Sequence, residues 1–265
     1  MLKNVILIVF SLFAISANAQ YWFGPKVGLH RNDFIYQESN YKSDSFDVKS
    51  NYNGQYGVVL VYQATEKYAV HGELYYERLN KKVTNKDGSD IPVYSKTNFN
   101  YLSLPFSLRW NFGREPTHFY IAGGPKLSLW LGGSGEILLD EFSEDKTVEG
   151  PLDYKMRFTS NRSDRGNNYR TIAEANILQY GLQVSSGVYF DVVSGGRVLL
   201  DVRYSFGHSN MGFNNNPDFS FDEYTEDWEF RNYTLSVSLA YLFEYNVALQ
   251  RKGASTNKIS KKSKR

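Results

Sequence analysis

The chain has 265 residues, of which 42% are hydrophobic and 16% aromatic, a composition that excludes a disordered protein and suffices for one large domain or two small ones. It contains no cysteine, which excludes disulfides, thiolate metal sites, cysteine nucleophiles and a lipid-modified N-terminal cysteine. The formal net charge is +2, but residues 244–265 hold seven Lys and Arg and a single Glu, so the basic character belongs to the C-terminal segment and the remainder after residue 19 is net acidic.

The first 19 residues have the three parts of a secretory signal peptide. Lys3 lies in a short basic region, an apolar run follows, and Ala17 and Ala19 fit a cleavage site before Gln20. A retained membrane anchor is the alternative, but about nine strongly apolar residues fall short of the ~20 that a spanning helix needs. We therefore expect a cleaved signal peptide over residues 1–19.

The rest of the chain alternates apolar and polar residues with a period of two, which predicts β-strands. The aromatic excess supports strands, because aromatic side chains favour a pleated, half-buried surface. In the clearest segment, residues 101–112, every even-numbered residue is apolar. The predicted strands lie near residues 21–30, 55–64, 69–79, 101–112, 118–131, 177–192, 197–207 and 232–243.

The composition of the two rows distinguishes a membrane barrel from a soluble one. The polar rows are rich in Gly, Ser and Gln with few charges, and the apolar rows carry aromatic residues near the strand ends. This pattern is typical of a transmembrane β-barrel, which is apolar outside, polar inside and girdled by aromatic residues at both interfaces. A soluble, lipocalin-like barrel that turns its apolar row inward is the alternative.

The connections alternate between long loops and tight turns. The first, third, fifth and seventh are long, and the second, fourth and sixth have about four or five residues, as in an up-and-down outer-membrane barrel. We predict an all-β protein, an eight-stranded antiparallel up-and-down transmembrane β-barrel over residues 20–243. Its long loops are expected outside the cell and both termini in the periplasm, with outer-membrane lipid as its surroundings.

Charged residues occur on the predicted inward rows. An eight-stranded barrel is filled by its own side chains, so we expect no open pore, and buried charges must be paired. We expect a structural network in which Glu73 and Asp201 neutralise Lys126 and Arg203; a proton or ion relay is the alternative. The residues expected near mid-height are Lys26, Glu73, Lys126, Asp201 and Arg203, with His71 and Arg109 on one side of them and Glu77 on the other.

The histidines do not predict a metal site. His30, His71, His118 and His208 lie on separate predicted strands without the spacing of metal ligands, so we expect no metal and no cofactor. The stretch from His208 to Asn210 resembles the His-x-Ser-Asn stretch of outer-membrane lipid A 3-O-deacylases, which are also eight-stranded barrels. In that family His and Ser are two residues apart, whereas His208 and Ser209 are adjacent and point oppositely on a strand. We therefore predict no catalytic residue and no small-molecule substrate.

The third and fourth long loops are acidic, and the fourth interleaves carboxylates with aromatic residues. Acidic loops are commonly solvated surfaces, but exposed aromatic residues between carboxylates indicate a contact surface. The candidates for an extracellular contact are Phe219, Phe221, Tyr224 and Trp228.

In the basic segment over residues 244–265, the Lys and Arg residues from Arg251 to Arg265 are set among Ser, Thr, Asn and Gly with almost no apolar residue except Ile259, so this stretch is expected to be disordered in isolation. Three roles are open: a solubilising overhang, attraction to anionic lipid head groups, or docking to an acidic periplasmic partner. The candidate docking residues are Arg251, Lys252, Lys258, Lys261 and Lys262.

Three segments carry a resemblance to a known family: residues 23–28 (FGPKVG), 101–108 (YLSLPFSL) and 119–125 (FYIAGGP). They resemble the PorT-like outer-membrane β-barrel family of Bacteroidota over essentially the whole mature barrel. Named members of that family belong to the type IX protein secretion system, which also supports gliding motility. The resemblance implies a non-enzymatic barrel that serves a secretion or surface assembly, with other envelope or secretion proteins as partners and no nucleic acid. A lipid A-modifying enzyme and a surface adhesion barrel are the alternatives.

Overall fold

The computed structural model describes residues 20–36, 46–85, 94–138, 152–158, 169–172, 174–192, 195–212, 220–221, 224–225 and 228–245. The predicted signal peptide and the candidate docking residues Arg251, Lys252, Lys258, Lys261 and Lys262 lie outside the described residues. The described strands are β1 (Gln20–Tyr36), β2 (Phe46–Lys49), β3 (Tyr52–Gln63), β4 (Tyr68–Asn85), β5 (Tyr94–Arg114), β6 (Thr117–Leu138), β7 (Leu152–Phe158), β8 (Tyr169–Ile172), β9 (Leu178–Asp191), β10 (Gly196–Gly207), β11 (Ser220–Phe221), β12 (Tyr224–Thr225) and β13 (Phe230–Tyr245).

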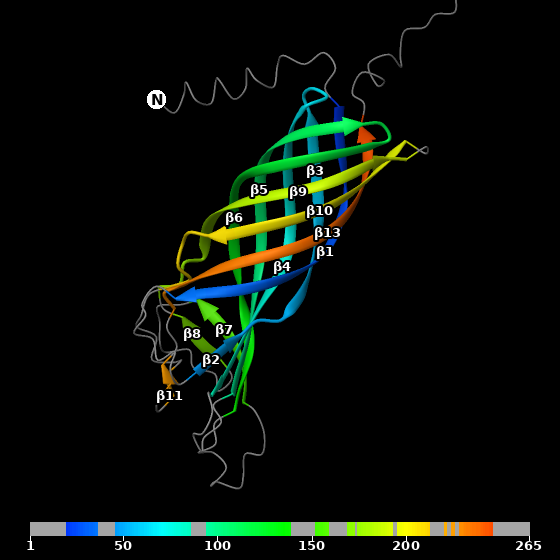
Figure 1. Cartoon of the computed structure of the whole chain (residues 1–265). Helices are drawn as coiled ribbons and strands as arrows, with labels where there is room; N and C mark the ends of the chain where they lie inside the picture. The colour runs from blue at the N-terminus through cyan, green and yellow to red at the C-terminus, as the bar shows by residue number, and fades with distance from the viewer. Residues whose placement is uncertain are drawn as a thin grey trace, which may run out of the picture.

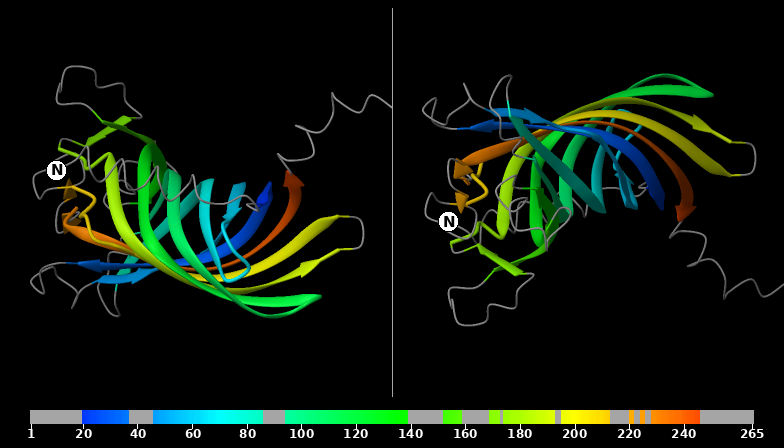
Figure 2. Two further views of the ribbon diagram at one scale, coloured as in Figure 1. Left: turned by 90° about the horizontal axis from the view of Figure 1, so that it is seen from above. Right: turned by 90° about the horizontal axis from the view of Figure 1, so that it is seen from below.

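Eight of the described strands close into a ring. Antiparallel pairing runs in the order β1, β3, β4, β5, β6, β9, β10, β13, and β13 pairs back with β1 from Tyr21↔Tyr245 to Tyr36↔Phe230. Figure 1 shows these strands inclined to the long direction of the barrel, and Figure 2 shows the same curved wall of strands from above and below. The predicted eight-stranded antiparallel barrel is confirmed.

The apolar rows of the strands face outward. On β5, Leu104 is 37% exposed whereas Ser103 beside it is fully buried, and the same alternation holds along β10. The lipocalin-like alternative is therefore wrong, because it requires the apolar row inside. Exposed aromatic side chains lie near both ends of the outward rows: Phe23, Trp110, Phe112, Phe119, Phe190 and Phe243 at one end, Tyr56, Tyr180 and Tyr204 at the other.

The two ends of the barrel differ. We call the end with the short connections β3–β4, β5–β6 and β9–β10 the turn end; β1 starts and β13 finishes there (Figure 1). The opposite end, with the long connections, is the loop end. Strand β13 runs to Tyr245, two residues beyond the predicted end of the barrel. No helix in the described ranges is long and apolar enough to cross a membrane.

The loop end contains strands that the alternation did not predict. Strand β2 pairs with β4, β7 with β6, β8 with β7 in parallel, and β11 with β12. Strands β5 and β6 also continue their pairing to Tyr94↔Leu138, well beyond the predicted segments. These extensions were missed because their outward rows turn polar, as at Lys96 and Glu136, while the backbone ladder continues.

Candidate functional site

The lumen at mid-height holds a network of buried charges from three strands. Arg203 on β10 donates from Nη1 to Glu73 Oε2 at 2.7 Å and from Nη2 to Glu73 Oε1 at 2.5 Å. Lys26 on β1 lies 2.8 Å from Glu73 Oε2 and 3.5 Å from Asp201 Oδ1, and Arg203 Nη2 lies 3.0 Å from the same Asp201 oxygen. Two carboxylates on β4 and β10 therefore hold two cations across the lumen.

Lys126 belongs to a second group, nearer the loop end. Its Nζ donates to Glu77 Oε1 at 2.6 Å, and Ser103 Oγ donates to the same oxygen at 2.6 Å. The expected neutralisation of Lys126 by Glu73 or Asp201 is thus wrong. The stagger between strands decides this, because it places Lys126 on β6 level with Glu77 rather than with Glu73.

The buried histidines extend these groups. His71 Nε2 lies 2.9 Å from Glu73 Oε1, and His30 Nε2 lies 3.0 Å from the backbone oxygen of Arg78. Over the ranges that the structure describes, no three His, Asp or Glu side chains gather as a metal site.

Toward the turn end, guanidinium groups and aromatic rings alternate in a ladder. The Arg197 guanidinium carbon lies 4.0 Å from the Trp22 ring centroid and 4.1 Å from that of Tyr189. The Arg109 carbon lies 4.5 Å from Tyr189 and 4.0 Å from Tyr120. Such cation–π contacts strengthen when desolvated, as they are here. The ladder fills the lumen between the charge network and the turn end.

Tyr120 joins the ladder to the charge network. Its hydroxyl donates to Asp201 Oδ2 at 2.6 Å. Gly187 on β9 makes room for this phenol, since a Cβ at Gly187 would lie 2.6 Å from the Tyr120 hydroxyl and 2.3 Å from the Leu200 carbonyl oxygen. The absence of a side chain at Gly187 is thus part of the lumen packing.

The loop end of the lumen is closed by an aromatic cluster. Phe99 packs edge-on against Trp130 and Trp228, with ring centroids 5.7 and 6.1 Å apart. The buried members of this cluster are Leu79, Phe99, Tyr101, Trp130, Ile137, Tyr154, Met156, Ile172, Met211, Trp228 and Phe230. All of these residues are at most 7% exposed, so they fill the lumen at this end of the described barrel.

The predicted extracellular contact needs one correction. Trp228 is 1% exposed, so it is a core residue of the aromatic cluster and not a surface contact. The cause is that Trp228, two residues before β13, packs against Phe99 and Trp130 inside the barrel, where an indole gains more from burial than from exposure. The backbones of Phe221 and Tyr224 are partners in the β11–β12 pairing. Their side chains, and the whole of Phe219, lie outside the described residues.

Ser209 has a structural role. Its Oγ accepts a hydrogen bond from the backbone nitrogen of Tyr180 at 3.0 Å and donates to the Tyr180 oxygen at 3.4 Å. The His208 ring packs against Tyr180 with centroids 5.5 Å apart. Among described residues no hydrogen bond joins His208 to Ser209, so the pair is not arranged as a base and nucleophile.

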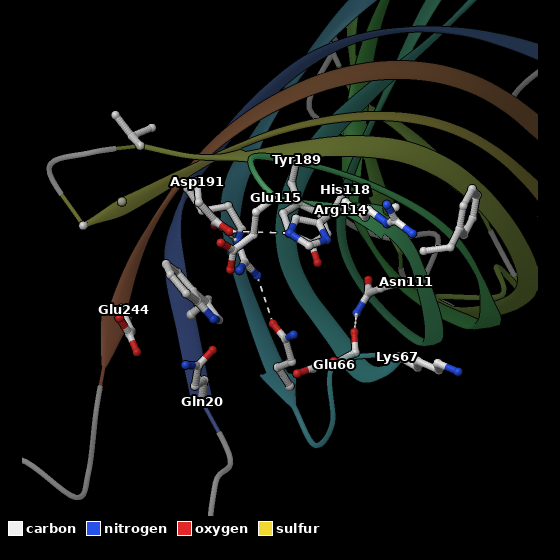
Figure 3. A pocket seen from close by; sticks show the side chains of 18 of the residues that line it. Gln20, Glu66, Lys67, Asn111, Arg114, Glu115, His118, Tyr189, Asp191 and Glu244 are labelled. Carbon is white, nitrogen blue, oxygen red and sulfur yellow. Dashed lines mark hydrogen bonds and ion pairs between the residues drawn. The ribbon is translucent and has the colours of Figure 1, made fainter.

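At the turn end the lumen opens into a cavity of about 880 Å³ (Figure 3). Its buried lining residues include Trp22, Asn111, Tyr189 and Arg197; its exposed rim includes Glu66, Lys67, Arg114, Glu115 and Glu244. Asn111 donates to the backbone oxygen of Glu66 at 3.3 Å, which ties the floor to the β3–β4 turn.

Comparison with known proteins agrees with this geometry. Residues 16–212 match the family described as the outer membrane protein beta-barrel domain. The chain belongs to this family. The protein is therefore an outer-membrane β-barrel, with its apolar rows toward lipid. No curated protein matches the chain.

Solved outer-membrane barrels are similar over most of their length. OprG from Pseudomonas aeruginosa is 11% identical with a TM-score of 0.45, covering 86% of this chain and 95% of its own. Ail of Yersinia pestis is 10% identical with a TM-score of 0.38, covering 84% of this chain and 98% of its own.

The sequence missed the ladder and the cavity. The period of two in residues 118–131 and 197–207 puts Tyr120 and Arg197 on the polar, inward rows, and this is the signal in the sequence that points to an aromatic–guanidinium layer. It could not show that Trp22 and Tyr189, from strands far apart in the chain, would meet the same arginine.

Proposed function

We propose that this barrel is a non-enzymatic scaffold of the outer membrane that serves a protein secretion or surface assembly. One observation carries the proposal: the bidentate contact between Arg203 and Glu73 spans the lumen, between the ladder at one end and the aromatic cluster at the other. A barrel filled in this way has no continuous path for solute, so its working surfaces are its two ends and its outer wall.

The resemblance to PorT-like barrels supports a role in type IX secretion. We place the long loops outside the cell and both termini in the periplasm, which is the usual orientation of outer-membrane barrels with alternating long and short connections. The loop end and the basic segment after Tyr245 would then contact different partners on opposite sides of the membrane.

Conductance and co-purification test the scaffold role together. The purified protein in planar lipid bilayers should show no stepwise conductance, where an open porin at the same protein-to-lipid ratio does. Affinity purification in a mild detergent should recover envelope or secretion proteins. A regular conductance through wild-type barrels would contradict the proposal.

The engagement of Ser209 with the Tyr180 backbone supports a non-enzymatic barrel over a lipid A deacylase. Mass spectrometry of lipid A from a deletion strain should show an unchanged acyl pattern. Lipid A that carries one additional acyl chain in the deletion strain would favour the enzyme, if the wild-type gene removes that chain again and the Ser209→Ala gene does not.

A further inference from the structure

The turn-end cavity has the size and lining of a ligand site. Its volume, about 880 Å³, lies within the ~300–1,000 Å³ of pockets that hold small molecules. Three turns and both ends of the barrel chain form its walls (Figure 3). Trp22, Tyr189 and Arg197, one end of the ladder, form its floor. The scaffold role proposed above does not use this cavity.

Arg197 is fixed at the floor of the cavity. Its Nε donates to Asp191 at 2.7 Å and its Nη1 to Gln63 at 3.0 Å, while its plane lies over Trp22 and Tyr189. The side chain is only 6% exposed. Its remaining nitrogen, Nη2, donates to no other residue in the described ranges. A guanidinium held this rigidly loses little entropy when it binds an oxyanion.

Three buried donor atoms beside this floor lack an acceptor in the described ranges. Arg109 Nη1 and Nη2 and Trp22 Nε1 have no hydrogen-bond partner among the described residues. Arg109 lies directly behind the lining residues Asn111 and Tyr189, with its Nε donating to Asn111 at 2.6 Å. Donors without acceptors favour a ligand group that is rich in acceptors. In the described ranges the guanidinium groups of Arg197 and Arg109 contact only one carboxylate, that of Asp191, so a negatively charged ligand group is favoured.

The rim limits the charge that such a ligand can carry. Glu66, Glu115 and Glu244 outnumber Lys67 and Arg114 around the mouth of the cavity. These groups are exposed and screened, so they disfavour a polyanion more than a single negative charge. Trp22, Tyr189 and Val192 add apolar lining that suits a hydrophobic body.

We propose that the turn-end cavity binds a monocarboxylate attached to an apolar or aromatic body, with Arg197 as its principal contact and Arg109 as the supporting positive charge. The carboxylate accepts a hydrogen bond from Arg197 Nη2, and it attracts the unpartnered donors of Trp22 and Arg109. The apolar body lies against the aromatic lining.

Thermal unfolding of the full barrel in a non-ionic detergent tests the ligand class. Benzoate should raise the unfolding midpoint in a saturable way, compared with sodium chloride at equal ionic strength. Benzyl alcohol, which has the ring without the charge, and inorganic phosphate, which has the charge without the ring, should raise it less. Equal stabilisation by benzyl alcohol or by phosphate would overturn the assignment.

Variants test the position of the site. Arg197→Lys keeps the charge but loses the planar fork, and should weaken benzoate binding about tenfold, the effect of losing one charge-assisted hydrogen bond. Arg231→Lys, the same change at the loop end, should leave binding unaltered. An unchanged affinity in Arg197→Lys would overturn the proposal.

A measurement on the wild-type chain covers the case in which Arg197→Lys does not fold. The protein has four tryptophans, so labelling with ¹⁵N-tryptophan resolves their indole N–H signals, and Trp22→Phe identifies that of Trp22. Benzoate should shift the Trp22 signal and leave Trp130 unmoved. A Trp22 signal that stays fixed up to saturating benzoate would refute the site.

Discussion

Arg203 on β10 and Glu73 on β4 form a bidentate ion pair across the lumen, 130 positions apart in the chain. Neither strand neighbours the other in the ring, so this contact ties together parts of the barrel wall that backbone hydrogen bonds do not join. Lys26 and His71 lie against the same carboxylate. Glu73 is therefore the residue on which the mid-lumen network depends.

Glu73→Ala should destabilise the barrel by about 3–5 kcal/mol, because it leaves Arg203 and Lys26 without their shared carboxylate. The temperature at which the folded band converts to the unfolded band on a gel should fall. Glu136→Ala is the matched control: Glu136 is paired with Lys96 at 3.9 Å and its side chain is 40% exposed, so loss of this ion pair should cost ~0–1 kcal/mol. Equal shifts in both variants would contradict the network.

The buried arginines Arg203 and Arg109 should respond differently to replacement by methionine. Arg203→Met should cost about 3–5 kcal/mol, since it leaves Glu73 and Asp201 short of a cation. Arg109→Met should change the free energy of unfolding by no more than ~1 kcal/mol, because its lost cation–π contacts are offset by removing a buried charge that contacts no carboxylate among the described residues. Urea unfolding in lipid vesicles measures both, and a large cost at Arg109 would show that an unseen anion pairs with it.

Gly187→Ala should destabilise the barrel by about 1–3 kcal/mol through overpacking, since the added methyl group meets the Tyr120 hydroxyl and the Leu200 carbonyl. Gly54→Ala provides the comparison, because nothing lies within 4 Å of its Cβ position. Both variants can be followed by thermal unfolding. A neutral Gly187→Ala would mean that Tyr120 can leave Asp201 at little cost.

Leu104→Arg should impair membrane insertion, because Leu104 faces lipid and a cation there costs about 2–4 kcal/mol near the bilayer midplane. Leu104→Phe keeps the apolar face and should insert normally. Ser103→Arg should instead act inside, by crowding the hydrogen bonds of Ser103 with Glu77 and Ser128. Folding into vesicles, followed by protease protection, separates the cases, and recovery of wild-type protein in a carbonate-soluble fraction would contradict the membrane location.

Truncation after Tyr245 should leave the barrel intact, because the β1–β13 pairing is complete at Tyr21↔Tyr245. If the basic segment docks an acidic partner, that partner should co-purify with the full chain, less so at high salt, and should not co-purify with the truncated protein. Replacing Lys258, Lys261 and Lys262 by Gln tests charge while keeping length. A truncated protein that retains every partner would eliminate docking.

The sequence by itself determined the barrel. Side chains alternate strictly across a strand, so the period of two assigned Leu104 outward and Ser103 inward without any tertiary information. The same alternation assigned Lys26, Glu73, Lys126, Asp201 and Arg203 to the inward rows, and the structure buries all five.

The tertiary structure decided which of these inward residues meet. Contacts across the lumen depend on the tilt and stagger of the strands, which set the relative height of residues on different strands and leave no periodic trace in the sequence. For that reason Lys126 meets Glu77 and not Glu73, and Tyr120 reaches Asp201. Trp228 was misassigned for a related reason: whether a residue before a strand faces water or folds over the lumen depends on the space that distant strands leave open.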